Sequence, residues 1–215
     1  MFLLMTLNNQ PLITDLLPNA EDPSKRDIYI DGDFYLTVPY LFLLEQDLHI
    51  GDPFGQEEEE RLLMAAQLTL AKEKAYQYLG YGDLSFKKLY EKLTRFGIEE
   101  RVAERACRIL EEQGLIDDRR LAEHLAHRLY EGKHYGPKRI LPELCQKGIP
   151  AEIAKEAVDA LPKEDEIHLS YWMERKYGRF DLSDPKERNK VFQGLCRYGF
   201  SFDEINHILK DFMDD

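Results

Sequence analysis

Hydrophobic and polar positions recur along most of this chain with a period of 51 residues. Gly97, Gly148 and Gly199 stand at that interval, with a leucine four residues before each glycine and an apolar residue directly after it. Repeats of roughly 20–50 residues are typical of proteins whose small helical units stack, because such a unit cannot bury its apolar face alone. The spacing therefore predicts a tandem repeat protein.

Each repeat is predicted to contain three short helices. The middle helix carries apolar residues at helical spacing, such as Leu89 and Leu93 in the first repeat. The glycine ends this helix, because the residue that follows a helix often has a positive φ. The pattern indicates a mainly all-α fold, a tandem repeat of three three-helix units that form an elongated, curved array.

The repeats are predicted to occupy residues 67–116, 117–163 and 164–215. Gly114 closes the first repeat, and Asp117 suits the N-cap of the second, because a carboxylate accepts hydrogen bonds from the N–H groups of the first turn. Asp184 and Glu187 have the spacing of a capping box at the start of the middle helix of the third repeat.

Residues 1–66 form an N-terminal extension with a different pattern. Residues 28–30 and 34–38 resemble strands, and Asp31-Gly32 between them is a strong signal for a two-residue hairpin turn. The apolar residues 1–7 are too short to span a membrane, and we interpret them as a strand or a loose end rather than a signal peptide. We expect a small β-hairpin, with a further strand at 12–14, a short helix within 39–50 and an acidic helix start at 56–60.

The charge is spread unevenly over the chain. Of the 215 residues, 43% are hydrophobic and 33% charged, and the net charge is −12. Residues 1–66 hold 13 acidic and 3 basic side chains, whereas the remainder holds 28 and 26, so a local basic surface in the helical part is compatible with the total. Three widely spaced cysteines without a secretion signal favour a reducing compartment. We expect a cytoplasmic monomer with no membrane contact.

The chain contains no recognisable catalytic constellation. It has no phosphate-binding loop of the nucleotide-hydrolase type, and the glycines at 80 and 82 lie between helical segments, where a dinucleotide site is not expected. His124 and His127 are one helical turn apart, but zinc needs three or four ligands, so we interpret them as surface residues. The sequence thus predicts no catalytic residue, no cofactor and no metal site, and indicates that the protein is not an enzyme.

Two of the cysteines occupy equivalent positions of the repeat. Cys145 and Cys196 are 51 residues apart, and Thr94 takes the same place in the first repeat. A small residue inside a packed helix accounts for all three positions, whereas a catalytic thiol has no reason to recur with the fold.

One stretch of the second repeat is both basic and aromatic. From Arg128 to Lys147 there are five basic side chains and two acidic ones, together with two tyrosines and a Gly-Pro turn. Such a stretch can bind an acidic protein surface or a phosphate backbone, or it can be a solvated helix face, and the sequence leaves both interpretations open. The candidate contact residues are Arg128, Lys133, Tyr135, Lys138, Arg139 and Lys147.

Several motifs of the second repeat resemble the hallmark stretch of the RecX family. They are GLIDDRRLA from residue 114, GPKRI from residue 136 and ELCQKGI from residue 143, and the closing segment after Gly199 is similar to the last repeat of that family. The likeness covers residues 71–212, about two thirds of the chain. It implies three tandem three-helix repeats, in agreement with the 51-residue period.

The resemblance also implies a function and a partner. Members of the family bind RecA, lie along the groove of its filament on single-stranded DNA, and suppress its ATPase, strand-exchange and coprotease activities, and some contact DNA directly and weakly. On the residues alone two rivals stay open. One is a helical-repeat adaptor for another protein, and the other is a DNA-binding module of the helix-turn-helix type, against which the net charge of −12 weighs.

Overall fold

Alternating residues near the N-terminus build a three-stranded antiparallel sheet. The computed structural model describes residues 10–214, so the interpretation of residues 1–7 lies outside the described part. The strands β1 (Ile13–Pro18), β2 (Lys25–Ile30) and β3 (Asp33–Pro39) lie in the order β1-β2-β3. Asp31 and Gly32 have φ values of 51° and 90°. Positive φ at both central residues is what a type I′ turn requires, so the predicted hairpin is confirmed. The further strand predicted at 12–14 is also confirmed as β1, which starts at Ile13, extends to Pro18 and pairs with β2.

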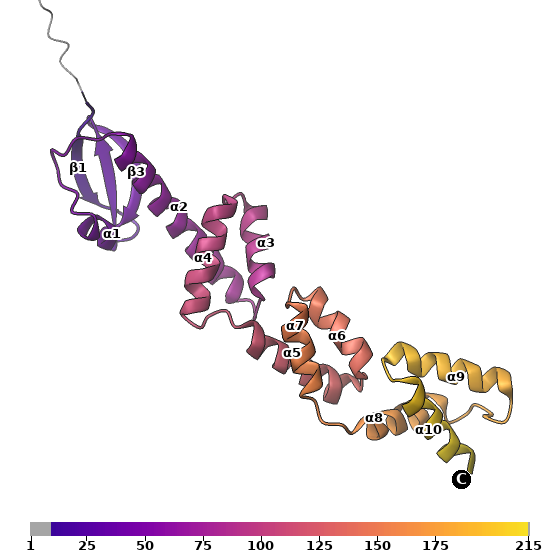
Figure 1. Ribbon diagram of the computed structural model, residues 1–215. Helices are drawn as coiled ribbons and strands as arrows, with labels where there is room; N and C mark the ends of the chain where they lie inside the picture. Colours follow the sequence, from indigo (N-terminus) through magenta and orange to yellow (C-terminus); the bar gives the residue numbers. More distant parts are fainter. Residues whose placement is uncertain (1–9, 215) are drawn as a thin grey trace, which may run out of the picture. The chain divides into compact units, whose positions relative to one another are not determined.

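Two helices pack against β3 (Figure 1). They are α1 (Tyr40–Glu45) and α2 (Gln56–Leu79), and α2 starts with the acidic run and passes through the boundary predicted at residue 67. The Tyr35 hydroxyl donates to Glu59 Oε1 at 2.8 Å and ties β3 to this helix. The shared core consists of Ile13, Ile28, Val38, Leu43, Phe54 and Leu62.

The chain folds as two compact units. One comprises residues 10–81 and 90–109, and the other comprises residues 82–89 and 110–214. The helices α3 (Phe86–Phe96) and α4 (Glu100–Glu112) of the first repeat therefore each contribute residues to both units.

The second repeat is a three-helix group with its own core. It consists of α5 (Asp118–Lys133), α6 (Pro137–Gln146) and α7 (Ala151–Asp159). The Asp117 carboxylate accepts the Arg120 N–H at 2.9 Å, which confirms Asp117 as the N-cap. The buried core is built from Ala122, Leu125, Ala126, Tyr130, Ile140, Leu144, Ile149, Ala154, Ala157, Val158 and Leu161.

The third repeat is less regular. Its helices are α8 (Asp165–Trp172), α9 (Pro185–Tyr198) and α10 (Phe202–Asp214), with a π-helical turn at Met173–Tyr177. The Asp184 carboxylate accepts the Lys186 N–H at 3.0 Å, as expected of an N-cap. Glu187 does not complete the predicted capping box, because its carboxylate accepts the Asp181 N–H at 2.7 Å instead and closes the loop before the helix.

The repeat-related positions behave alike in their backbone but not in their burial. Gly97, Gly148 and Gly199 have φ values of 104°, 84° and 100°, so each ends its helix as the sequence predicts. Packing inside a helix is the wrong explanation for Cys145, which is exposed, whereas Cys196 is half-buried. The buried face of α6 runs through its neighbour Leu144, and the next residue on a helix points about 100° away from that face.

Candidate binding surface at the junction of the second and third repeats

The structure divides the six candidate residues into two groups. Arg128, Lys133 and Lys147 are exposed, and within residues 10–214 their side chains have no ion-pair or cation–π partner. The other three, Tyr135, Lys138 and Arg139, lie where the second repeat meets the third. Among the described residues, the side chains of this second group form a joint surface with side chains of the third repeat.

Arg139 is held between the two repeats by stacking and hydrogen bonding. Its guanidinium carbon lies 3.8 Å from the centre of the Tyr135 ring and 5.9 Å from that of Tyr198. Its Nη1 donates to the carbonyl of Arg197 at 3.3 Å, and its Nε lies 3.9 Å from Glu143 Oε1. The planar guanidinium therefore fixes the tyrosines of both repeats while keeping part of its own edge in solvent.

The third repeat supplies the rest of the surface. Trp172 and Tyr198 stack with ring centres 3.7 Å apart and planes 17° from parallel. The Lys176 ammonium donates to the Tyr198 hydroxyl at 2.8 Å, and this hydrogen bond raises the pKa of Lys176, which stays charged at neutral pH. Lys138 lies 5.5 Å from the ring of Phe202, an exposed residue of α10. We call this set the junction surface: Tyr135, Lys138, Arg139, Trp172, Lys176 and Tyr198.

Direct backbone contact holds the junction surface together. The N–H of Gly136 donates to the carbonyl of Tyr198 at 2.8 Å, and the N–H of Lys138 donates to that of Gly199 at 3.1 Å. A Cβ atom on Gly136 would lie 2.5 Å from the Gly199 oxygen, and one on Gly199 would lie 2.4 Å from the Arg139 nitrogen. Both glycines are required, because any side chain would push the repeats apart.

The same contact recurs one period earlier. Ser85, which is 51 residues before Gly136, donates its hydroxyl to the carbonyl of Lys147 at 2.7 Å. A Cβ atom on Gly148 would lie 2.6 Å from the Ser85 Oγ. At Gly97, the third equivalent position, a Cβ atom would meet nothing within 4 Å. Within the unit of residues 82–89 and 110–214, the loops at Ser85 and Gly136 thus each contact the next repeat glycine, Gly148 and Gly199, and we call each of these contacts a glycine corner.

A pair of histidines lies beside this contact. The Nδ1 atoms of His134 and His168 are 2.8 Å apart, and the His168 ring packs edge-on against Tyr130 with centres 4.0 Å apart. Burial lowers the pKa of His168, and the neighbouring His134 lowers it further. His124 and His127, by contrast, are exposed on α5, as the sequence predicts.

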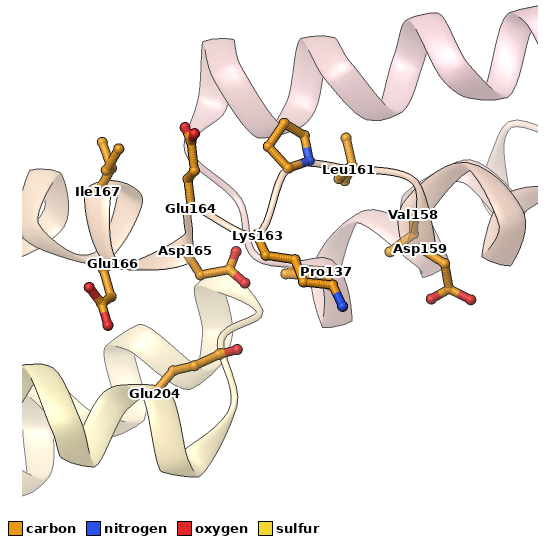
Figure 2. Close-up of a pocket in the computed structure, with 11 residues that line it drawn as sticks. Pro137, Val158, Asp159, Leu161, Lys163, Glu164, Asp165, Glu166, Ile167 and Glu204 are labelled. Atoms are coloured by element: carbon orange, nitrogen blue, oxygen red, sulfur yellow. The ribbon is translucent and has the colours of Figure 1, made fainter.

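The junction also contains an acidic hollow of about 710 Å³, shown in Figure 2. Figure 2 shows the carboxylates of Asp165 and Glu204 turned toward the same space beside Lys163. Burial raises the pKa of Asp165, and the charge of Glu204 raises it further. Five carboxylates and one ammonium group line the hollow, so its field repels phosphate, and an anionic ligand is favoured at the junction surface instead.

Comparison with known proteins places both repeats in one family. The model for the second three-helix domain of RecX matches residues 117–158, and the model for the third three-helix domain matches residues 164–209. Regulatory protein RecX of Stenotrophomonas maltophilia (strain R551-3) is 33% identical over 131 residues, which cover 61% of this chain and 80% of that protein. The chain belongs to the RecX family.

Other RecX proteins extend the similarity to the N-terminal unit. Regulatory protein RecX of Clostridioides difficile (strain 630) is 28% identical over 205 residues, which cover 94% of this chain and 96% of that protein. A crystal structure of regulatory protein RecX superposes with a TM-score of 0.78 at 23% identity and covers 94% of this chain and 99% of that one. The crystal structure of RecX from Lactobacillus salivarius superposes with a TM-score of 0.63 at 25% identity. The match covers 69% of this chain and 98% of that one.

Every residue of the junction surface falls within the two matched RecX domains. Sequence reasoning found the half that belongs to the second repeat and missed Trp172, Lys176 and Tyr198. The sequence offered one indication of Tyr198, because it directly precedes a repeat glycine, as the candidate residue Lys147 does. That indication does not say which loop the residue meets, since the contact depends on how the repeats dock.

The RecX relatives are named regulatory proteins, and this chain shares their family. Within residues 10–214, no group of three or more histidine, cysteine or acidic side chains is placed to hold a metal ion. None of the helices in that range combines the length and the apolar character that a membrane crossing demands. The lack of a cofactor and of catalytic activity stays a prediction from the sequence.

Proposed function

We propose that this RecX-family protein regulates a RecA recombinase in the cytoplasm by binding the RecA filament on single-stranded DNA and inhibiting its ATPase, strand-exchange and coprotease activities. Family membership supports the regulatory role, and the resemblance of the repeat motifs supports RecA as the partner. The observation that carries the proposal is the junction surface, where cations from two repeats gather on aromatic rings in a chain of net charge −12.

The chemistry of the junction surface fits an anionic partner. Lys138 and Lys176 are exposed, and neither is neutralised by an ion pair with a carboxylate in the described part of the chain. The aromatic rings beneath them supply contact area and stack with bases or apolar side chains. Repeats that each contribute a weak contact bind a repeating filament with avidity, because every later contact is intramolecular.

Direct DNA binding and a different protein partner are the alternatives that the experiment separates. We propose to add the purified full chain to RecA already assembled on single-stranded DNA and to follow ATP hydrolysis. The same protein is titrated onto labelled single-stranded DNA without RecA. Inhibition with weak DNA binding supports the proposal. Inhibition that varies with DNA affinity supports competition with RecA for DNA. If the protein does not inhibit RecA, the remaining hypothesis is an adaptor for a different protein.

Replacing Lys138 with glutamate is expected to weaken inhibition without loss of helix. Lys138 is exposed, so the reversal leaves the core intact, but it places a like charge against the partner. The cost is on the order of 1–3 kcal/mol if the contact is desolvated, which is roughly 5- to 150-fold in the concentration for half-inhibition. The measurement is RecA ATPase inhibition at several salt concentrations, with helical content checked by circular dichroism.

Lys163→Glu is the matched control, because Lys163 is also exposed but lies in the acidic hollow. Its reversal should leave inhibition unchanged. Arg139→Glu is unsuitable as a first test, since it also removes the stacking that fixes Tyr135. Equal effects of Lys138→Glu and Lys163→Glu would remove the junction surface from the binding site and leave Arg128, Lys133 and Lys147 as the candidates to reverse next.

A further inference from the structure

Two histidines at the junction take no part in the proposed binding surface. His134 follows the last turn of α5, and His168 lies in α8 with 3% of its surface exposed. Their Nδ1 atoms are 2.8 Å apart, which is hydrogen-bond distance. The pair is therefore a side-chain link between the second and third repeats that depends on protonation.

His134 contacts α8 in two further ways. Its carbonyl accepts the Trp172 Nε1–H at 2.7 Å, and its ring stacks on Tyr171 with centres 3.8 Å apart. Its φ of 51° is left-handed, a conformation that costs a residue with a Cβ atom about 1–2 kcal/mol. The contacts with α8 offset this strain, and the His134 corner in turn holds Trp172 against the second repeat.

The Nδ1 contact depends on how many protons the two rings carry. When both rings are neutral, one Nδ1 donates and the other accepts. One added proton is tolerated, because a charged ring can still donate to a neutral one. With two added protons both Nδ1 atoms are donors and both rings are cations, so the hydrogen bond is lost and the rings repel.

The surroundings disfavour a charge on His168. Burial and His134 lower its pKa, and the opposing effects of Glu131 on α5 and Glu164 before α8 are smaller. Burial raises the pKa of Tyr130, so this facing ring is uncharged at neutral pH, and the ring of Tyr171 stacks on His134. Because the pKa of folded His168 lies below the value of about 6.5 in the unfolded chain, its contribution to stability is present above that pH. The contribution is lost as the pH falls from there toward the folded value.

We propose that His134 and His168 form a proton-dependent latch. When both rings are charged, the latch opens, α8 separates from the end of α5, and Trp172 and Tyr198 are released from the second repeat. The junction surface then loses its shape, and filament binding weakens in acid. Only this last step rests on the proposed function.

Trp172 is the single tryptophan of the chain, so tryptophan emission reports on the surroundings of this one residue at the junction. In the full-length protein we expect a step in Trp172 emission as the pH is lowered below about 6.5, before helix is lost by circular dichroism. Histidine-ring nitrogen shifts measured by NMR should show His168 taking up its proton over the same pH range as the emission step. A featureless emission profile down to the pH of global unfolding would overturn the latch.

His168→Asn separates the latch from a merely structural role. The amide keeps a neutral hydrogen-bonding group near the Nδ1 position but cannot be charged, so the emission step should disappear while inhibition at neutral pH persists. The matched control is His124→Asn, an exposed histidine of α5, which should retain the step. An unchanged step in His168→Asn would overturn the proposal. If that variant fails to fold, His134→Asn tests the same bond from its half-buried side.

RecA inhibition measured at pH values on either side of the step completes the test. Wild type should lose inhibition across the step, and His168→Asn should keep more of it. If the wild type inhibits at neutral pH and loses no more inhibition in acid than His168→Asn, the latch does not regulate binding. If the wild type never inhibits RecA but the fluorescence step is present, the proposed function fails and the latch stands.

Discussion

Alanine at the three repeat glycines is expected to destabilise the protein by unequal amounts, least at Gly97 and most at Gly199. The three positions have the same place in the repeat and similar positive φ values, from 84° to 104°. The strain of placing a Cβ atom on a left-handed residue is therefore common to all three, about 1–2 kcal/mol. What differs is the space around each added methyl group.

That space is empty at Gly97, is occupied by the Ser85 and Lys88 side chains at Gly148, and is occupied by backbone at Gly199. A side chain can move aside, whereas the Arg139 nitrogen, 2.4 Å from the added carbon, moves only with α6. Gly199→Ala therefore also breaks the two backbone hydrogen bonds of the junction. We expect a total loss of roughly 3–5 kcal/mol at Gly199, against the strain alone at Gly97.

The measurement is the free energy of unfolding from urea titration of the three full-length variants. Gly97→Ala serves as the internal control, because it carries the backbone strain without the collision. Equal losses at Gly97 and Gly199 would mean that the repeats do not dock through the glycine corner. Gly199→Ala should also weaken RecA inhibition, since Tyr198 and Arg139 can no longer meet.

Trp172→Ala is expected to uncouple the third repeat from the second. The indole stacks on Tyr198 and donates to the His134 carbonyl, so alanine removes both contacts and leaves that carbonyl without its donor. Because Trp172 is only partly buried, we expect a loss of about 2–4 kcal/mol, at or below the range for fully buried aromatic residues. Inhibition of RecA should fall with it.

Trp172→Phe divides this effect into its parts. Phenylalanine keeps an aromatic face for Tyr198 but has no N–H, so the cost should be about 1 kcal/mol, the usual worth of one hydrogen bond. Urea unfolding gives the stabilities, and RecA ATPase assays give the function. A phenylalanine variant as damaged as the alanine variant would show that the indole N–H, and not the stacking, holds the junction.

Local pattern was enough to predict most of the elements. The hairpin follows from Asp31-Gly32, because few residues other than glycine, asparagine and aspartate tolerate the positive φ of a type I′ turn. The helix ends follow from the repeat glycines for the same reason. Glu187 was misassigned because a carboxylate near a helix start has several N–H groups within reach, and the loop decides which one it takes.

The binding surface was only half visible in the sequence. The excess of positive charge around residue 138 identified Lys138 and Arg139, but Arg128, Lys133 and Lys147 share that charge without sharing the junction. The partners Trp172 and Tyr198 lie more than 30 residues away along the chain, with nothing local to connect them to the basic stretch. Cys145 shows the same limit of the sequence, because equivalent positions in a repeat have different neighbours in the folded protein.

The sequence by itself determined the helical period, the glycine corners, the N-terminal hairpin and the family, since each depends on residues close together or on their spacing. Only the tertiary structure decided at which repeat glycines the space for a Cβ atom is occupied. It also decided that His134 faces His168 and that two repeats share one surface of cations and aromatic rings. The physical reason is that local conformation is set by φ preferences and helical periodicity, whereas docking is set by the shapes of surfaces that meet only after each repeat has folded.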